Sequence, residues 1–364
     1  MLKQRSGLIL ALIAFTLFLF WSVSIRQSLL FVVGIGLGLV LAGFRFGFTT
    51  GWRHLIEQRD ASGAYAQLLL LAIAAAISLP LLAAFPGELS AALGPPGVSL
   101  LVGALVFGAA MQIADGCGSG TLYKAGLGIP LNMAILPMFA LGSFLGSAHL
   151  GWWLDLGAMQ PVSLLDSAGL SGALLLTFAG LACIAGLCFW WSKGSAVQRP
   201  VFSKGLMIGA VLLAILAVLN LVIAGQPWGI VYSFGLWGAK IAQATHLFDP
   251  GVNAFWSQPS NATALQQSVF LDVTTITSLG ILAGALLIFA GKKDDKQAKL
   301  TTTQWIVGIT AGFLLGYSSR LAFGCNVGAM VSGISTGSLH GWIWVALAFI
   351  GSLAGVRIRK YYGY

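Results

Sequence analysis

Charged side chains are scarce in this sequence. Of its 364 residues, 58% are hydrophobic and only 8% are charged. A soluble domain carries about 25% charged residues, so this chain cannot cover a surface that faces water. The composition excludes an ordinary soluble protein and predicts an all-α integral membrane protein surrounded by the lipid bilayer. No stretch is long and polar enough to form an attached soluble domain.

Cysteine is also scarce, and no CxxC pair occurs. The four cysteines lie in apolar or glycine-rich segments, which argues against a disulfide framework. Cys117 and Cys325 lack the flanking residues of a zinc or haem site, so no metal and no cofactor are predicted. Cys183 and Cys188 fall within one uninterrupted apolar run, where a packing role is expected.

Charge of one sign is in excess, since 19 Lys and Arg residues against 10 Asp and Glu give a net charge of +9. In a membrane protein such an excess of basic residues indicates cytoplasmic loops rich in Lys and Arg rather than a nucleic-acid partner. The basic residues form five clusters: Lys3/Arg5, Arg53/Arg59, Lys193/Arg199/Lys204, Lys292/Lys293/Lys296/Lys299 and Arg357/Arg359/Lys360. The segments 86–97, 151–169 and 246–267 carry no Lys or Arg.

Long apolar runs are abundant, and at about 20 residues per crossing they predict about ten transmembrane helices. The expected spans are 7–25, 28–45, 64–85, 98–114, 130–150, 170–191, 204–224, 268–290, 303–322 and 339–356. With ten crossings and both termini in the cytoplasm, every basic cluster lies inside, as expected of a multi-pass protein of the cell inner membrane. No clear small-residue cleavage site follows the first run, so it is expected to be a retained helix rather than a signal peptide.

Four further apolar segments are too short and too rich in glycine to cross a membrane: 46–52, 116–126, 229–243 and 324–337. Non-helical backbone at membrane depth is tolerated only where protein or a water-lined cavity surrounds it. These segments are therefore predicted to form re-entrant short helices.

Two parts of the sequence match each other at a constant offset. The matched pairs are Gly108 with Gly316, Gly116 with Gly324, Cys117 with Cys325, Gly120 with Gly328 and, after a slip of one residue, Gly142 with Gly351 and Gly146 with Gly355. A weaker match pairs Phe46-Gly47-Phe48 with Phe234-Gly235-Leu236. Because the predicted spans place the two parts in opposite directions, we expect inverted-topology repeats, with a substrate site at their interface. The expected division is 1–27 (an extra transmembrane helix), 28–150 (the first repeat), 151–203 (a linker with one transmembrane helix) and 204–364 (the second repeat).

The candidate site combines a thiol with glycines in each repeat. Its expected pathway residues are Gly116, Cys117, Gly118, Gly120, Arg320, Gly324, Cys325, Asn326 and Gly328. Half-helix ends present unpaired N–H groups and the positive end of a dipole, which favour an anion. A thiol is polarisable and a weak donor, so the pair predicts a path for a small sulfur-containing anion. The alternative is that both cysteines serve only helix packing.

Three charges inside apolar segments have more than one interpretation. Arg320 either draws anions toward the constriction, pairs with a carboxylate or extends to the membrane surface. Asp115 either caps the following half-helix or pairs with Lys124 or Arg320. Lys240 either attracts anions at the outer side of the membrane or is an interfacial lysine.

The motifs around the two cysteines resemble those of a known family. The stretch Asp115-Gly116-Cys117-Gly118-Ser119-Gly120-Thr121-Leu122-Tyr123-Lys124-Ala125-Gly126 looks like the pattern GGCxxGTxYRxGxG, and Gly324-Cys325-Asn326-Val327-Gly328 looks like a second GGCxxG. On these residues the chain resembles the YeeE/YedE sulfur-transport family, which includes thiosulfate permeases of the TsuA type. The resemblance implies an hourglass of inverted repeats in which Cys117 and Cys325 pass thiosulfate along by transient hydrogen bonds.

One departure from the family pattern concerns the segment 46–52. We call the short glycine-rich segments that follow the long apolar runs breaks, and this segment is the first of them. Where the family commonly reads RFCxTGxxR, this chain reads Arg45-Phe46-Gly47-Phe48-Thr49-Thr50-Gly51-Trp52-Arg53. Gly47 therefore stands where the family has a third pathway cysteine. This leaves sulfide, a polysulfide, a sulfonate and a selenium analogue open as substrates beside thiosulfate.

The main functional hypothesis is a carrier or channel for a small sulfur-containing anion, and not an enzyme. The alternative is a membrane sulfur relay, in which a cysteine takes up sulfane sulfur as a persulfide and passes it to a cytoplasmic sulfur-carrier protein. The frequent association of the family with small sulfur-carrier proteins favours this alternative and makes such a protein an expected partner. A third hypothesis is a purely structural membrane subunit.

Overall fold

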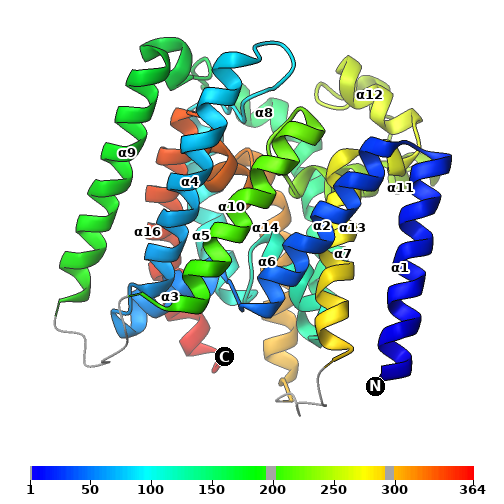
Figure 1. The fold of residues 1–364 in the computed structure, drawn as a ribbon, viewed down its shortest axis with the longest axis horizontal. Coiled ribbons are helices and arrows are strands. Elements are labelled where there is room, and N and C mark those ends of the chain that lie inside the picture. The colour runs from blue at the N-terminus through cyan, green and yellow to red at the C-terminus, as the bar shows by residue number, and fades with distance from the viewer. Residues whose placement is uncertain (1, 194–201, 292–298) are drawn as a thin grey trace.

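The computed structural model describes residues 2–193, 202–291 and 299–364 (Figure 1). Within these ranges the regular structure is helical and contains no named strand, which confirms the predicted all-α class. Four members of the predicted basic clusters, Arg199, Lys292, Lys293 and Lys296, lie outside the described residues.

Ten long helices correspond to the ten predicted spans. They are α1 (Leu2–Ser22), α2 (Ile25–Gly43), α4 (Ser62–Ala84), α5 (Val98–Ile113), α7 (Pro130–Ala148), α9 (Leu164–Ser192), α10 (Lys204–Ala224), α13 (Val273–Phe289), α14 (Thr302–Leu321) and α16 (Leu339–Tyr361). Of the helices in the described ranges, nine are long and apolar enough to cross a membrane, and α13 is an apolar helix of 17 residues. At 1.5 Å per residue α13 spans about 26 Å, close to the roughly 30 Å of a bilayer's hydrocarbon core.

Helix α13 begins later than the predicted span, which started at residue 268. Asp272 caps the helix, because its carboxylate accepts a hydrogen bond of 2.7 Å from the backbone N–H of Thr275. The preceding residues form a separate 3-10 turn, η2 (Val269–Leu271). The cap therefore explains the shorter helix.

Helix α9 begins earlier than the predicted residue 170. The hydroxyl of Ser163 accepts a hydrogen bond from the backbone N–H of Asp166, which fixes the start at Leu164. The helix then bends at Gly169, whose φ of 65° suits a residue without a side chain.

A short helix occupies each of the four segments predicted to be re-entrant. These are α3 (Phe48–Gln58), α6 (Gly118–Gly126), α11 (Val231–Ala244) and the π-helix η3 (Asn326–Ser332), which continues as α15 (Gly333–Ser335). Helix α3 is longer than the predicted segment 46–52. Connections elsewhere contain α8 (Leu150–Asp155), η1 (Pro250–Val252) and α12 (Pro259–Gln266).

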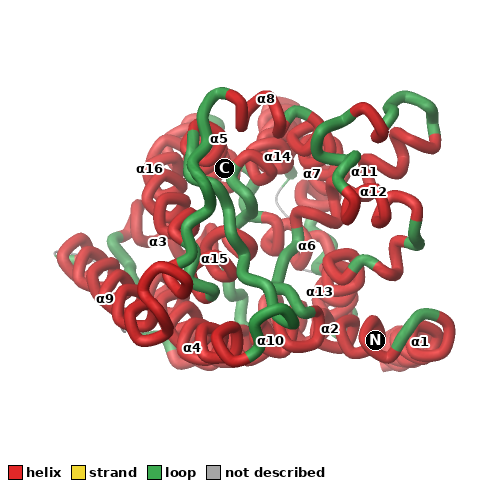
Figure 2. The backbone as a smooth tube through the Cα atoms, turned by 90° about the horizontal axis from the view of Figure 1, so that it is seen from above, coloured by secondary structure: helices red, strands yellow, loops and turns green. Residues whose placement is uncertain are grey.

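Viewed from above, the long helices form a ring around short central ones (Figure 2). Helix α5 packs on α14 and α16, α7 packs on α14, and α2 packs on α10 and α13. Helices α6 and α11 pack against α7 and α13, while α3 and α15 pack against α4 and α16. Helices α1 and α9 lie outside the ring, at opposite ends of the molecule (Figures 1 and 2).

Glycines allow α5 and α16 to approach each other closely. A Cβ at Gly108 would overlap the carbonyl oxygen of Ala348, and one at Gly351 would overlap that of Leu105. Membrane helices commonly use small residues in this way, since tight packing replaces the hydrophobic effect between them.

The same contacts recur between α7 and α14. A Cβ at Gly316 would overlap the carbonyl oxygen of Phe139, and one at Gly142 would overlap that of Phe313. These residues are the sequence-matched counterparts of the α5–α16 contacts, at an offset of 208 for α5 and α14 and of 209 for α7 and α16. The sequence match therefore has a counterpart in the packing.

Both ends of the chain lie on one face of the molecule (Figure 1). The same face carries helix α3, the end of α9 and the starts of α10 and α14, whereas α8 and α12 lie on the opposite face. Lys204 begins α10, and Arg359 and Lys360 lie in the last turn of α16. Lys204, Arg359 and Lys360 thus lie on the face where both termini lie.

Candidate functional site

Three long helices end in the same way before a short helix begins. After α2, α5 and α14 the chain passes through a left-handed residue, which is Arg45 (φ 50°), Asp115 (φ 55°) or Phe323 (φ 56°). The amide that follows bonds back to a carbonyl five residues earlier, as from Gly116 to Met111 at 3.1 Å, and the other two breaks repeat this bond. This ending satisfies the last carbonyls of the long helix and turns the chain.

The residue that begins each new helix is Gly47, Cys117 or Cys325. Each has an extended backbone, and its carbonyl accepts the first helical hydrogen bond. The first N–H groups of a helix have no partner within it. Each thiol therefore lies at a place where backbone donors are unpaired.

The weaker sequence match is not reproduced in the helix starts. Gly47 precedes the first residue of α3, whereas Gly235 lies inside α11. The residue that starts α11 is Ile230. A Cβ at Gly118 would lie 3.6 Å from the Ile230 side chain, so the α11 start still contacts the region of the thiols.

The structure brings the surroundings of the two thiols together. Both cysteines have 0% exposed surface. A Cβ at Gly118, the residue directly after Cys117, would lie 3.1 Å from the Sγ atom of Cys325. The Cys117 Sγ lies 3.3 Å from the hydroxyl of Ser119. Residues more than 200 positions apart in the sequence thus meet in the protein interior.

Backbone amides lie beside both sulfur atoms. Those of Ser119 and Gly120 interact with Cys117, and those of the matched residues Val327 and Gly328 interact with Cys325. The amide of Gly118 also reaches Cys325, across the contact between the two breaks. Each sulfur therefore faces several N–H donors, as an anion in its place would.

The glycines before the cysteines have a steric role. A Cβ at Gly116 would lie 3.0 Å from the backbone nitrogen of Thr121, and one at Gly324 would lie 2.5 Å from that of Ala329. Gly324 also has a φ of 152°, which side chains rarely adopt. Glycine at these positions keeps the first turn of each short helix uncovered.

Several buried polar atoms next to the thiols have no hydrogen-bond partner among the described residues. Asn326 is fully buried, and both atoms of its amide are unpartnered. The hydroxyl of Thr121, which lies beside Gly116, is unpartnered as well. Buried polar groups are nearly always hydrogen-bonded, so such a cluster marks a place where a polar ligand or water is expected.

The first break contains hydroxyl groups in place of a thiol. A Cβ at Gly47 would lie 2.9 Å from the hydroxyl oxygen of Thr50 and 3.6 Å from that of Tyr123. Tyr123 also interacts electrostatically with Cys117 and Asp115. It therefore connects the first break with the second.

Asp115 lies in a cluster of charged residues that the sequence revealed only in part. Its carboxylate pairs with Lys124 at 2.6 Å, as one of the alternatives expected, and with Arg53 at 2.7 Å and Arg359 at 3.6 Å. Lys124 also donates to the backbone carbonyl of Asp115. The Arg53 and Arg359 contacts were missed, because no local pattern links residues 53, 115 and 359.

Among the described residues, Arg320 forms no ion pair with a carboxylate. Its neighbours are aromatic rings. Its guanidinium lies 4.9 Å from the ring centre of Phe255 and 5.7 Å from that of Tyr232. The Nε atom is buried without a hydrogen-bond partner among described residues. Of the three interpretations of Arg320, pairing with a carboxylate is not observed among the described residues, and the position over two rings was not predicted.

Lys240 holds a loop. Its ammonium donates hydrogen bonds of 2.6 Å to the carbonyls of Leu265 and Gln267, at the end of α12. These contacts favour an anchoring role over the alternative of an anion attractor.

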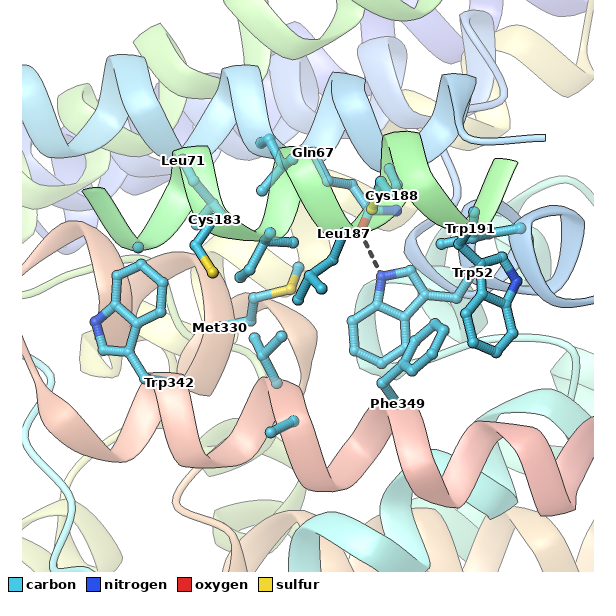
Figure 3. Close-up of a pocket in the computed structure, with 17 residues that line it drawn as sticks. Trp52, Gln67, Leu71, Cys183, Leu187, Cys188, Trp191, Met330, Trp342 and Phe349 are labelled. Atoms are coloured by element: carbon cyan, nitrogen blue, oxygen red, sulfur yellow. Dashed lines mark hydrogen bonds between the residues drawn. The ribbon is translucent and has the colours of Figure 1, made fainter. Parts of the chain in front are cut away.

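An apolar cavity of about 420 Å³ lies between α9 and the ring (Figure 3). Its lining includes Cys183, Cys188 and Trp191 of α9, together with Trp52 and Met330. The indole N–H of Trp52 donates to Gln67 at 2.9 Å within this wall. Cys188 is buried and Cys183 is exposed, so both cysteines belong to this peripheral wall and not to the central pair.

The described residues contain no group of three His, Cys, Asp or Glu side chains that could hold a metal ion. The central site is instead built from thiols, amide N–H groups and hydroxyls, with cations on either side. This arrangement, inside a ring of apolar helices, defines a multi-pass membrane protein with a buried polar centre.

Comparison with known proteins gives the family. The sequence profile described as Sulphur transport matches residues 44–354. The chain is 26% identical to the thiosulfate transporter TsuA of Spirochaeta thermophila over 346 residues, which cover 90% of this chain and 98% of that protein. It is 20% identical to the thiosulfate transporter TsuA of Escherichia coli over 338 residues, 88% and 91% of the two chains. A match to the probable transporter YedE of Escherichia coli is 30% identical over 139 residues, 37% and 33% of the two chains.

The chain belongs to the sulphur transport family, as the resemblance of its cysteine motifs predicted. Its relatives are named as transporters, which agrees with membrane transport rather than with an enzyme.

Proposed function

We propose that the protein carries a small sulfur-containing anion of the thiosulfate type across the cell inner membrane, past Cys117 and Cys325. The observation that carries the proposal is the position of the two thiols. Each begins a short helix and is fully buried, and Cys325 lies against the residue that follows Cys117. The likeness to proteins named thiosulfate transporters over nearly the whole chain supports this substrate class.

The chemistry of the site fits an anion that ends in sulfur. Backbone N–H groups and the helix dipole favour negative charge. The thiol adds a weak S–H donor and a polarisable atom, which suits the terminal sulfur of thiosulfate. The amide of Asn326 offers a further donor at the same level. The anion advances by exchanging hydrogen bonds, and no covalent bond forms or breaks.

At the first break, a hydroxyl group is available to bind the anion where the family commonly has a cysteine thiol. Thr50 fills the volume that a side chain at Gly47 would need. The family pattern RFCxTGxxR has glycine at the position of Thr50, so the two departures occur together. Hydroxyl donors bind oxygen atoms well, so this exchange favours an anion that carries oxygen, such as thiosulfate or a sulfonate, over sulfide.

The matched helix contacts support the interpretation as inverted repeats, 28–150 and 204–364. The close glycine contacts between α5 and α16 have counterparts between α14 and α7, and the three similar breaks begin short helices that we interpret as re-entrant. The glycine-interrupted helices then meet near the midplane, where transporters of this construction bind their substrates.

The two sides of the membrane are assigned from the charges. The face with both chain ends, Lys204, Arg359 and Lys360 is taken as cytoplasmic by the positive-inside rule. Arg320, on the other side of the thiols from Asp115, is then an outer group that draws anions inward. A small sulfur-carrier protein on the cytoplasmic face is the partner implied by the family resemblance.

The test is uptake of labelled thiosulfate into liposomes that contain the purified protein. The variants Cys117→Ala and Cys325→Ala should each reduce uptake at least about tenfold, as loss of a donor in a water-excluded path implies. Cys183→Ala and Cys188→Ala are matched controls, because these thiols line the peripheral cavity, and their uptake should equal that of the wild type.

Two outcomes would contradict the proposal. Full uptake in the folded double variant of Cys117 and Cys325 would remove the thiols from the path. A mass increase of one sulfur atom on either cysteine during turnover would instead establish the sulfur relay, which needs a persulfide.

A further inference from the structure

The charged cluster around Asp115 combines residues from separate parts of the ring. Arg53 comes from α3, Lys124 from α6 and Arg359 from α16. Arg53 and Arg359 approach Oδ1 of Asp115, and Lys124 approaches Oδ2. The three basic side chains are only 12–15% exposed, whereas the carboxylate is 26% exposed. The cluster is therefore enclosed by protein and yet accessible at the carboxylate.

The charges of this cluster do not balance. Three cations surround one carboxylate, which leaves an excess of two positive charges. The charge of the nearby Glu57 also acts on Arg359, but Glu57 brings a further cation with it, since Lys360 pairs with it at 3.4 Å, and the excess therefore remains. Charges removed from water are costly unless they are compensated. An enclosed site with a surplus of positive charge is suited to a second anion.

The guanidinium groups retain binding capacity beside Asp115. The ion pairs with the carboxylate involve the Nη1 atom of Arg53 and of Arg359, whereas a guanidinium carries five N–H donors. Arg359 additionally donates from Nη1 to the carbonyl of Gln112 at 3.0 Å, which fixes the guanidinium. Pre-positioned guanidinium groups are well suited to oxyanions.

The cluster is next to the proposed path. Asp115 precedes Cys117 by two residues, and Tyr123 interacts with Asp115, Arg53 and Cys117. An anion that leaves Cys117 toward the cytoplasm reaches these cations next.

We propose that Arg53, Lys124 and Arg359 form an inner anion site, in which the Asp115 carboxylate is a tethered counter-ion that competes with the transported anion and promotes its release. This inference rests on the proposed transport function. Without Asp115 the three cations would hold an anion more tightly and free it more slowly. With it, a divalent anion neutralises the surplus, whereas a monovalent anion of the same shape leaves one charge uncompensated.

The experiment measures uptake kinetics of full-length protein in liposomes for thiosulfate and for methanethiosulfonate, a monovalent anion in which a methyl group replaces one oxygen. Asp115→Asn should lower KM and lower kcat together, each by about tenfold, since one close charge contact is worth about that factor or more. Lys124→Gln should raise KM for thiosulfate and reduce its advantage over methanethiosulfonate. Lys124→Arg keeps the charge and should restore the wild-type preference.

A purely structural role for the cluster predicts a different result. Folded Asp115→Asn protein would then show a lower kcat without a lower KM, and that result would overturn the inference. Equal uptake of both anions by the wild type would also overturn it while leaving transport intact. Should folded Asp115→Asn protein be too scarce, the Lys124→Gln and Lys124→Arg pair decides the question by charge preference. Failure of the wild type to take up either anion would overturn the transport proposal itself, and this inference with it.

Discussion

The stretches around Cys117 and Cys325 share a backbone but differ in charge. Asp115 and Phe323 occupy matched positions with nearly the same φ, 55° and 56°. Five residues before each cysteine stand Gln112 and Arg320. In one stretch the carboxylate joins three cations, and in the other the arginine lies over two aromatic rings.

This comparison separates the backbone features that form the site from the charged residues that we expect to guide an anion through it. Glycines and the left-handed turn create the two thiol-bearing helix starts, irrespective of the residue that adopts the turn. The charges do not follow the match, and in the transport proposal they lie at the two ends of the path. Substitutions can therefore probe the shared backbone separately from the differing charges.

The largest effect is expected at a shared helix contact. Gly316→Ala places a methyl group on the carbonyl oxygen of Phe139, and Gly108→Ala does the same at Ala348. Forcing the helices apart should cost about 3 kcal/mol or more of stability. The fraction of protein that elutes as a single species after detergent extraction should fall for both variants.

Gly186→Ala is the matched control for this prediction, because nothing lies within 4 Å of a Cβ there. Its yield should equal that of the wild type. If the yield fell strongly for only one of Gly316→Ala and Gly108→Ala, the two helix contacts would not be equivalent, which contradicts the comparison.

The next effect concerns the contact between the two breaks. Gly118→Ala would place a methyl group 3.1 Å from the Cys325 sulfur, whereas Gly120→Ala would place one 3.7 Å from that of Cys117, an ordinary contact. Since displacing a positioned group by about 1 Å can cost up to about 100-fold in rate, thiosulfate uptake should fall at least about tenfold for Gly118→Ala. Similar uptake by both folded variants would show that the gap beside Gly118 is not on the path.

A smaller effect is expected from the outer arginine. Arg320→Gln removes a charge that attracts anions, so KM for thiosulfate should rise about three- to tenfold with little change in kcat. High salt should weaken the wild type more than the variant. Lys240→Gln serves as the control, since Lys240 is bonded to loop carbonyls, and an equal rise in KM there would deny Arg320 a special role.

The smallest effect is expected at the first break. The double variant Gly47→Cys with Thr50→Gly exchanges the hydroxyl for a thiol and should shift the preference between thiosulfate and sulfide about two- to threefold toward sulfide, as a single weak donor implies. Competition between the two anions measures this shift. Gly47→Cys alone should be less stable, because Thr50 occupies its space; an equally stable single variant would contradict that explanation.

The sequence was sufficient to predict the helices and the places where they break. Apolar runs predicted every long helix, and glycine next to Cys117 and Cys325 marked two of the starts. Because glycine has no side chain to interfere at such a turn, glycine in the sequence marks the turn without any knowledge of tertiary contacts. The bounds of α9 and α13 were less predictable, because they depend on the caps at Ser163 and Asp272.

The partners of the charged residues were not predictable. Arg359 reaches Asp115 across 244 positions of sequence, and Arg320 finds Tyr232 and Phe255 on other elements. Periodicity and spacing describe one helix at a time, whereas these contacts depend on how several helices pack. The same holds for the cavity beside α9, whose wall is assembled from four helices and the π-helix.

The π-helix at 326–332 accounts for an irregularity in the numbering of the two halves. Residues before it correspond at an offset of 208, and those in α7 and α16 correspond at 209. A π-helix bonds each carbonyl to an amide five residues on instead of four, so its wider coil houses one additional residue without lengthening the segment. The insertion is absorbed locally, directly after Cys325, and the glycines of α16 still meet α5 as those of α7 meet α14.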